Sequence, residues 1–363
     1  MKIKINKKDL INALQIVHNI ITPKATLPIL SNILVETFNN KLRLISTDLD
    51  IGITCLLPVE IIEQGAITLP ARRFIEIIKE LSEEEITITT KKNNTTIIET
   101  KKCQFKLLSL PKEEFPKLPE LKDKEVLKLQ QAQFKKMINL TSFAVSNDES
   151  RYVLNGILFK AKENKLTMVA TDGRRLAIIN EELDSRVNKE IQVVIPIKTI
   201  HELNRNLGED ADISIIVSNN QALFDLEQIV IISRLIEGDF PDYNQVIPPS
   251  VEEKLKVERE QLLAALRRAA LLITPDYQAV KFEISKNKLF ISKSTPDIGE
   301  SWEELSAEYL GKELVVGFNP NYLIDVLKHL PDAQIEIESA ESEKPAVIRS
   351  GGYIYIVLPM RLS

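Results

Sequence analysis

An internal repeat of about 124 residues constrains this chain more than any other feature of its sequence. The tripeptide Asn-Lys-Leu occurs at residues 40–42, 164–166 and 287–289, so that successive copies are 124 and 123 residues apart. Further identities keep the first separation, since Leu30 corresponds to Leu154 and Thr47 to Thr171. Chance does not produce a string of matches in register, and the sequence therefore predicts three homologous domains of about 120 residues each.

Segments rich in proline separate the three repeats. Residues 111–119 and 241–249 are such segments, and Glu-Phe-Pro at residues 114–116 recurs as Asp-Phe-Pro at residues 239–241. Short extended linkers of this composition hold neighbouring domains at a fixed angle. We therefore expect an N-terminal domain at residues 1–122, a middle domain at residues 123–250 and a C-terminal domain at residues 251–363.

Each domain is itself doubled. Apolar residues at helical spacing recur about every 60 residues, and they predict helices at residues 8–20, 70–81, 131–145, 196–208, 259–272 and 319–330. Alternating, β-branched runs between them predict strands, for example at residues 41–47, 85–90, 95–100, 165–171 and 353–358. The unit is a strand, a helix and about three more strands, used six times. An α+β fold follows, with helices on one side of antiparallel sheets.

Charge is distributed unevenly between the helices and the rest of the chain. The net charge is -5, yet the six predicted helices together carry +6 and the remainder carries -11. If the helices line one surface, that surface attracts the phosphates of a duplex without reading its sequence. For any single cation an ordinary solvated helix face is the better explanation, so only the sum over six repeats favours nucleic acid.

Several other classes of protein are disfavoured by what the sequence lacks. Two cysteines, Cys55 and Cys103, cannot build a disulfide framework or a close-spaced metal motif, which is typical of a reduced, cytoplasmic protein. No phosphate-binding glycine motif is present, and no apolar run reaches the ~20 residues of a membrane span. We therefore expect no catalytic residue, no metal, no cofactor and no membrane contact.

Four motifs give the chain a specific resemblance. Residues 151–156 (RYVLNG), 170–177 (ATDGRRLA), 238–243 (GDFPDY) and 358–362 (LPMRL) resemble the bacterial DNA sliding clamps, which are the beta subunits of the replicative DNA polymerase III. The resemblance covers the full chain, and it implies that each chain forms half of a closed ring, a head-to-tail homodimer around duplex DNA. Twelve helices packed at about 9–10 Å would enclose a hole of roughly 25 Å, which admits a B-form duplex.

The resemblance also implies partners and a site for them. Such a ring confers processivity on the polymerase III alpha subunit without chemistry of its own, and a separate ATP-driven clamp loader opens it. Polymerases, loader subunits and repair proteins bind by short peptides in an apolar pocket between the middle and C-terminal domains. The matching positions here are Leu154, Thr171, Gly173, Arg174, Arg175, Leu176, Pro241, Val246, Ile356, Val357, Leu358, Pro359, Met360, Arg361 and Leu362. Apolar side chains and a pliable methionine suit such a pocket, although Leu154, Leu176 and Val357 are equally well explained as core residues.

Two further sets of residues follow from the same resemblance. The expected DNA contacts are Lys24, Arg73, Tyr152, Lys198 and Arg205. The expected dimer contacts are Phe105, Leu107, Leu271 and Leu272. The chain departs from the family pattern at Val153, Arg174 and Gln245, and by an extra Ser363 after the usual final leucine. These departures put one DNA contact and one peptide contact in doubt.

Two rival interpretations remain open from the sequence. Asp48, Asp50 and Asp172 end strands in equivalent repeats, and paired carboxylates can hold a metal or act as acid and base. Their repetition favours turn formation instead, because Asp caps tight turns. A repeat scaffold that binds proteins but never encloses DNA is the second rival.

Overall fold

The structure, a computed structural model, describes residues 1–21, 27–91, 93–119, 125–339 and 341–362. The chain forms two compact units. Unit 1 consists of Met1–Gln133 and His201–Leu235, and unit 2 of Phe134–Ile200 and Ile236–Ser363. The middle third of the sequence therefore contributes to both units.

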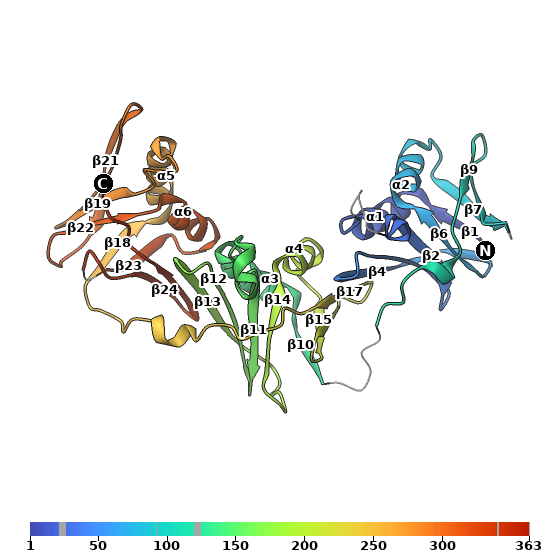
Figure 1. Cartoon of the computed structure of the whole chain (residues 1–363), viewed down its shortest axis with the longest axis horizontal. Coiled ribbons are helices and arrows are strands. Elements are labelled where there is room, and N and C mark those ends of the chain that lie inside the picture. Colours follow the sequence, from blue (N-terminus) through green and yellow to red (C-terminus); the bar gives the residue numbers. More distant parts are fainter. Residues whose placement is uncertain (22–26, 92, 120–124, 340, 363) are drawn as a thin grey trace. The chain divides into compact units, whose positions relative to one another are not determined.

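The chain repeats one order of elements six times: a strand, a helix and three strands (Figure 1). The helices are α1 (Lys7–His18), α2 (Ala71–Glu80), α3 (Gln131–Thr141), α4 (Ile197–Asn206), α5 (Arg259–Ala269) and α6 (Pro320–His329). This order agrees with the predicted α+β class and with three doubled domains. One extra strand, β5 (Glu60–Glu63), interrupts the pattern in the first repeat and was not predicted.

Unit 1 contains two antiparallel sheets. The five-stranded sheet has the order β5-β1-β7-β8-β9 and the eight-stranded sheet the order β10-β15-β16-β17-β4-β3-β2-β6. Besides β5, the strands are β1 (Lys2–Asn6), β2 (Asn32–Phe38), β3 (Lys41–Thr47), β4 (Ile51–Pro58), β6 (Ala66–Pro70), β7 (Glu85–Lys91), β8 (Thr95–Glu99), β9 (Gln104–Leu108), β10 (Val126–Gln130), β15 (Asp212–Val217), β16 (Gln221–Asp225) and β17 (Ile229–Arg234). Because β4 pairs with β17, the sheet runs without a break from the N-terminal third into the middle third.

Unit 2 contains one continuous sheet of the order β14-β11-β12-β13-β25-β24-β23-β18-β21-β20-β19-β22. Its strands are β11 (Gly156–Lys162), β12 (Lys165–Thr171), β13 (Arg175–Glu182), β14 (Ile191–Pro196), β18 (Lys254–Glu258), β19 (Val280–Ser285), β20 (Lys288–Thr295), β21 (Gly299–Glu308), β22 (Leu314–Phe318), β23 (Gln334–Glu338), β24 (Ala346–Ser350) and β25 (Tyr353–Val357). The β13–β25 pair joins the middle third to the C-terminal third, as β4–β17 joins the first two thirds in unit 1.

The helices are amphipathic and bury one face on a sheet. In α2, Phe74 and Ile78 are fully buried, whereas Arg72 and Arg73 on the opposite face are exposed. A helix of this pattern is held by the burial of its apolar stripe, at roughly 1.5–3 kcal/mol for each large side chain. The charged faces therefore remain available to solvent in every repeat where they occur.

The three Asn-Lys-Leu copies occupy one structural position. Each lysine begins the second strand of a hairpin, because β3, β12 and β20 start at Lys41, Lys165 and Lys288. Asn40 and Asn287 have the left-handed backbone angles φ 58° and 60°, which asparagine tolerates better than most residues. In the second copy the left-handed residue is Glu163, with φ 56°, so the sequence repeat marks the same hairpin turn but not the same residue at its left-handed position.

Candidate functional site

Strand pairing in unit 2 brings the predicted pocket residues of the middle and C-terminal thirds together. In the β13–β25 ladder, Leu176 lies opposite Ile356 and Arg175 opposite Val357. One step beyond the strand, the Leu358 amide donates to the Arg174 carbonyl at 2.9 Å. Residues that are about 180 positions apart in the chain therefore lie side by side.

An apolar cluster, partly open to the surface, lies on one face of this ladder. Leu176 and Ile356 belong to a buried cluster with Leu158 and Val347, and Phe240 packs on it from the linker before the C-terminal third. Leu154 and Tyr243 are half-buried against the same cluster. We call this surface the partner groove. The buried residues of this cluster belong to the core of the protein. The half-buried residues around them, such as Leu154 and Tyr243, are the ones that a bound segment could contact.

The side chain of Arg175 makes its contacts within the protein rather than at the surface. Its side chain is only 10% exposed, and its guanidinium lies 2.9 Å from Asp172 Oδ2 and 2.7 Å from Asp325 Oδ2. It also packs over the Tyr322 ring, 4.5 Å from the ring centroid. Burial works against the charged form, but nearby Tyr355 and the two aspartates raise the pKa of Arg175 above its ordinary value. Arg175 thus ties α6 of the C-terminal third to β13 of the middle third.

The turn before Arg175 explains several other predicted pocket residues. Asp172 Oδ1 accepts from the amides of Arg174 and Arg175 at 2.8 and 3.0 Å, and the Thr171 hydroxyl donates to the Arg175 carbonyl at 2.6 Å. Gly173 has φ +87°, which requires glycine or a strained residue. Thr171 and Gly173 therefore shape the rim, while the side chain of Arg174 is exposed on it.

The same kind of turn explains the aspartates that an enzymatic function would use. Asp48 Oδ1 accepts from the amides of Asp50 and Ile51 at 3.0 and 2.8 Å, in the position equivalent to Asp172. These hydrogen bonds confirm that Asp48 and Asp172 cap turns. Within the described ranges, no three His, Cys, Asp or Glu side chains lie close enough together to hold a metal ion.

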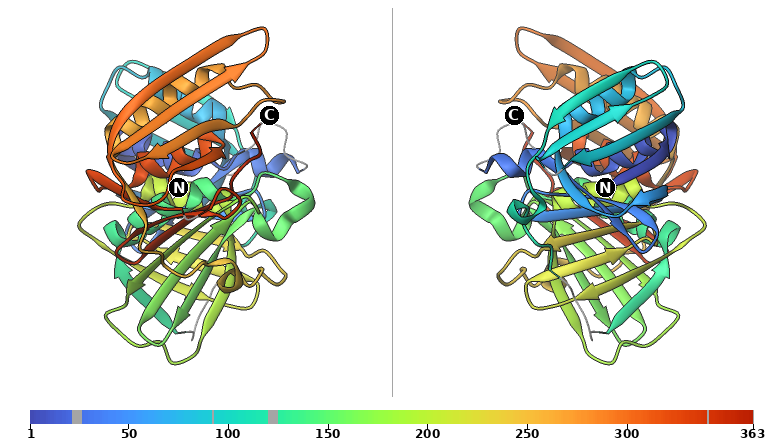
Figure 2. Two further views of the ribbon diagram at one scale, coloured as in Figure 1. Left: turned by 90° about the vertical axis from the view of Figure 1, so that its left-hand side faces the viewer. Right: turned by 90° about the vertical axis from the view of Figure 1, so that its right-hand side faces the viewer.

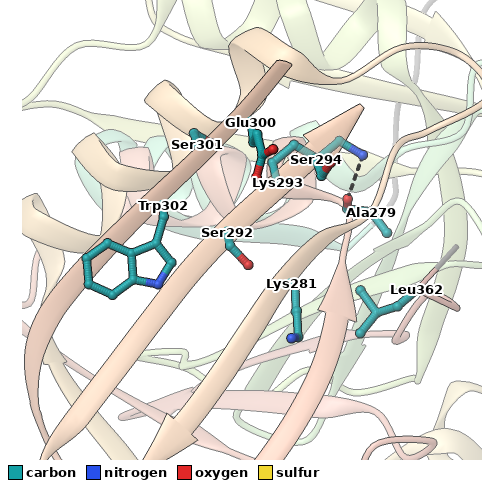
Figure 3. Close-up of a pocket in the computed structure, with 9 residues that line it drawn as sticks. All are labelled: Ala279, Lys281, Ser292, Lys293, Ser294, Glu300, Ser301, Trp302 and Leu362. Atoms are coloured by element: carbon teal, nitrogen blue, oxygen red, sulfur yellow. Dashed lines mark hydrogen bonds between the residues drawn. The ribbon is translucent and has the colours of Figure 1, made fainter. Parts of the chain in front are cut away.

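The C-terminal tail lies along the outermost strand of the unit 2 sheet. The Met360 amide donates to the Gly317 carbonyl of β22 at 2.8 Å, and a Cβ at Gly317 would come within 2.5 Å of the Met360 carbonyl oxygen. Glycine is required at that position by the approach of the tail backbone. Figure 3 shows Leu362 beside Lys281, across a shallow hollow from Trp302 of β21. Pro359 and Arg361 line a second hollow with Val315.

The predicted DNA contacts lie in both units. Lys24 falls outside the described residues. In unit 1, Arg73 is exposed on α2 and pairs with Glu76 at 3.0 Å, and Arg205 of α4 pairs with Glu202. In unit 2, Lys198 is exposed on α4, and Tyr152, in the 3₁₀ segment η4 (Glu149–Leu154), is 57% exposed.

Carboxylates reduce the positive charge of the helix faces. The Arg72 guanidinium donates a hydrogen bond to Glu76 and, together with Arg73, lowers the pKa of that carboxyl. The negative charge of Glu76 is thus shared between the two arginines. Solvent-exposed pairs of this kind contribute little stability and exchange readily. The faces can therefore offer cations to phosphates without a strong fixed site.

The predicted dimer contacts lie at two open strand edges. In unit 1, β9 is the last strand of its sheet and carries Phe105 and Leu107. In unit 2, β21 pairs with β20 along its length but with β18 only at its last two residues. Leu271, in the 3₁₀ turn η6 (Ala270–Leu272) that contacts β21, is 80% exposed. Figure 2 presents the orange β20–β21 hairpin in its left view and the cyan β8–β9 hairpin in its right view.

The sequence-based prediction missed residues whose partners are distant in the chain. Tyr322 and Asp325 hold Arg175, and Phe143 stacks on His329 with the ring centroids 5.2 Å apart. No local pattern marks these residues. Leu108 was missed as well, although it is 78% exposed on the open strand β9, where a third apolar residue in QFKLL was a visible signal.

The fold and this apolar surface define a class of protein: a repeat of sheet-and-helix domains with a partly exposed apolar cluster at the junction of two sequence repeats. The N-terminal, central and C-terminal domain families of the DNA polymerase III beta subunit match residues 1–119, 128–242 and 244–361. The chain therefore belongs to the family of DNA polymerase III beta subunits, the DNA sliding clamps.

Individual relatives agree over the whole length. The beta sliding clamp of Chlamydia muridarum is 32% identical over 363 residues, covering 100% of this chain and 99% of the relative. The crystal structure of the DNA polymerase sliding clamp from Bacillus subtilis is 31% identical, with a TM-score of 0.96 and 100% coverage of both chains. A Pseudomonas aeruginosa sliding clamp, solved bound to griselimycin, is 32% identical, with a TM-score of 0.95 and the same coverage.

Proposed function

We propose that two copies of this sliding clamp join head to tail in a closed ring around duplex DNA. Sliding clamps are processivity factors without catalytic activity of their own, and this chain has that role in replication. The observation that carries the ring is the pair of open edges, β9 and the first part of β21, because an unpaired edge is a template for another strand. Phe105, Leu107, Leu271 and Leu272 would then be buried between the two copies.

The helices supply the DNA-facing surface in this proposal. Lys24, Arg73, Tyr152, Lys198 and Arg205 would make exchangeable phosphate contacts, which permit sliding because they carry no sequence information. The proposed domain boundaries remain at residues 122 and 250, and the proposed location is the cytoplasm. Among the described residues, no helix is long and apolar enough to cross a membrane.

The partner groove would tether the polymerase. Its proposed ligands are short peptides of the polymerase III alpha subunit, of the clamp loader, and of other polymerases and repair proteins. The supporting observation is that the groove residues of both thirds and the Leu358 amide meet at the β13–β25 ladder. Leu154, Leu176, Pro241, Val246 and the tail would grip apolar anchors, and Arg174 would meet the polar end of the peptide.

Two variants separate the two parts of the proposal. Removing residues 359–363 should weaken peptide binding by at least tenfold while the protein stays dimeric, because the Leu358 amide ties the start of the tail to Arg174 at the groove, and the Met360 amide bonds to β22 rather than to β9 or β21. Lys24→Glu with Arg73→Glu should reduce retention on circular DNA and leave peptide binding intact, because reversed charges repel phosphates. Each is measured by fluorescence polarisation with a polymerase-derived peptide and by a loading assay on nicked plasmid. Unchanged peptide affinity would contradict the groove assignment, and unchanged loading the DNA contacts.

A further inference from the structure

Unit 1 contains a second groove built on the same register as the partner groove. There β4 of the N-terminal third pairs with β17 of the middle third, as β13 pairs with β25 in unit 2. The facing pairs are Gly52–Ile232 and Thr54–Val230 in unit 1, and Leu176–Ile356 and Ile178–Ile354 in unit 2. Each residue of unit 2 follows its counterpart in unit 1 by 124 positions, which is the period of the sequence repeat.

The correspondence extends across neighbouring strands and into the linker. Leu34 faces Ile45 across β2 and β3, as Leu158 faces Val169 across β11 and β12. Phe115 of the first linker is buried against Leu34 and Ile45, in the manner of Phe240 in the second linker. The two junctions are therefore equivalent in backbone pairing and in the position of the linker aromatic ring.

A substitution on β4 is the first difference between the two grooves. Gly52 stands where the partner groove has Leu176, and Leu118 of the linker fills the space, since its Cδ2 lies 2.5 Å from where a Cβ of Gly52 would be. The chain thus supplies from its own linker the leucine that the strand lacks. Leu118 thus occupies the space beside Gly52, and the open part of the second groove lies further along β4, beside Thr54 and Leu56.

That open part is large and mainly apolar. It is a hollow of about 720 Å³, within the usual range for ligand pockets. Its apolar walls come from strands β2, β3, β4, β16 and β17 and from the linker: Leu34, Phe38, Ile45, Leu56, Leu118, Leu223, Val230 and Ile232. Phe38 is 40% exposed at the rim. The counterparts of Phe38 and Leu56 at the partner groove are Lys162 and Asn180, so the second groove is the more apolar of the two at this end.

Charge on the lining favours an anionic segment. Three cations and two carboxylates line the hollow, and Arg43 neutralises Glu36 by an ion pair of 2.6 Å. Lys112 and Lys117 are exposed on the linker side, opposed there only by Glu113 among the lining residues. Their charges are thus available to a carboxylate next to an apolar anchor.

We propose that this second groove binds a short extended peptide of a client protein, one that carries apolar anchors and at least one carboxylate. The ligand class is taken from the partner groove and so rests on the function proposed above. A sheet face with cross-strand pockets and a linker wall suits an extended segment, which presents side chains alternately to the pockets. A clamp with two grooves per chain could hold two clients at once.

The test is a selection followed by affinity measurement. A random heptapeptide display library is selected on the full-length protein, and enriched peptides are labelled with fluorescein for polarisation titrations. We expect one group of peptides to lose at least tenfold in affinity with Val230→Glu while keeping its affinity for the protein lacking residues 359–363. These peptides should contain two apolar residues and an Asp or Glu. The matched control is Ile354→Glu, at the same register position of unit 2, which should leave this group unaffected.

The outcomes separate this inference from the proposed function. If every selected peptide is lost with the tail deletion and none with Val230→Glu, the second groove is overturned and the partner groove stands. If peptides depend on Val230 alone, the partner groove assignment fails and the second groove stands. A failure to select any peptide overturns both. Should Val230→Glu unfold, Phe38→Ala removes an exposed groove wall instead, and unchanged affinity in a folded Phe38→Ala protein also overturns the second groove.

Discussion

At the scale of single residues, Arg175 shows how one side chain joins two domains. Its guanidinium pairs with Asp172, three positions earlier in the chain, and with Asp325, 150 positions later, and the Arg175 side chain is little exposed to solvent. Arg175→Gln leaves both carboxylates without their partner, and breaking such a pair costs about 3 kcal/mol. We expect a loss of that size in the free energy of unfolding, measured by urea titration of the full chain.

Arg174 provides the matched control for this prediction. It is the neighbouring arginine and is exposed, so Arg174→Gln should change the free energy of unfolding by no more than about 0.5 kcal/mol. Equal losses in the two variants would mean that the network around Arg175 does not stabilise unit 2. Arg175→Lys should recover only part of the stability, because an ammonium cannot make the forked contacts of a guanidinium.

At this scale the sequence predicts contacts between residues that are close along the chain, and not contacts between distant ones. The turn role of Asp172 was predictable, because its hydrogen bonds are made to residues two and three positions on. The family resemblance placed Arg175 among the pocket residues and gave no indication of its burial. Its burial depends on Asp325 and Tyr322 of another domain, and no local spacing encodes a contact over that separation.

At the scale of elements, β4 and the first linker depend on each other. Gly52 leaves room that Leu118 fills, and a Cβ at Gly52 would also come within 3.0 Å of Ile232. We expect Gly52→Leu to destabilise unit 1 by overpacking, by about 1–3 kcal/mol, and Leu118→Ala to destabilise it by loss of burial. In the double variant the new leucine takes the place of the old one, as Leu176 does in unit 2.

A double-mutant cycle by thermal or urea unfolding measures this exchange. The double variant should be more stable than the sum of the single losses implies, by about 1 kcal/mol or more, because the two side chains share one space. Strictly additive losses would contradict the exchange. Leu56→Ala, further along the open part of the groove, is a control that should be additive with Gly52→Leu.

The elements themselves were the most predictable level of this structure. All six helices fall at the predicted positions, since each needs only an apolar stripe within about ten residues. The ends were less predictable: the pattern at residues 131–145 and 259–272 continues through 3₁₀ turns, η3 (Ser142–Ala144) and η6, beyond the α-helices. Apolar periodicity does not distinguish a final 3₁₀ turn from a helical one.

At the scale of the whole molecule, the two open edges have opposite charges. Lys101, Lys102 and Lys106 lie on β9 or just before it. Strand β21 carries Glu300, Glu303 and Glu304, of which Glu303 pairs with Arg268 and Glu304 with Lys288 within the chain. Such edges would attract each other in the head-to-tail arrangement and repel in a head-to-head one. Phe105 and Leu271 would supply the apolar part of this contact. The internal repeat predicts the number of domains but does not identify the residues at which two copies would meet.

Leu271→Glu tests the ring directly. One chain has a mass of 41.2 kDa, and light scattering should give about twice that for the unaltered protein across a dilution series. Because Leu271 is 80% exposed in the single chain, the substitution should leave the fold intact while placing a carboxylate beside the acidic edge of β21, so we expect a monomer. Trp302, the single tryptophan, is 63% exposed on β21 and should report the separation by its fluorescence.

Leu310→Glu separates loss of the contact from a general effect of removing an exposed leucine. Leu310 is 89% exposed and follows the paired end of β21, so this variant should remain a dimer and stay on circular DNA. A protein that is monomeric at every concentration without any substitution would contradict the ring, because three domains alone do not encircle a duplex. The partner groove would then belong to a scaffold, since peptide binding at the β13–β25 ladder requires only one chain.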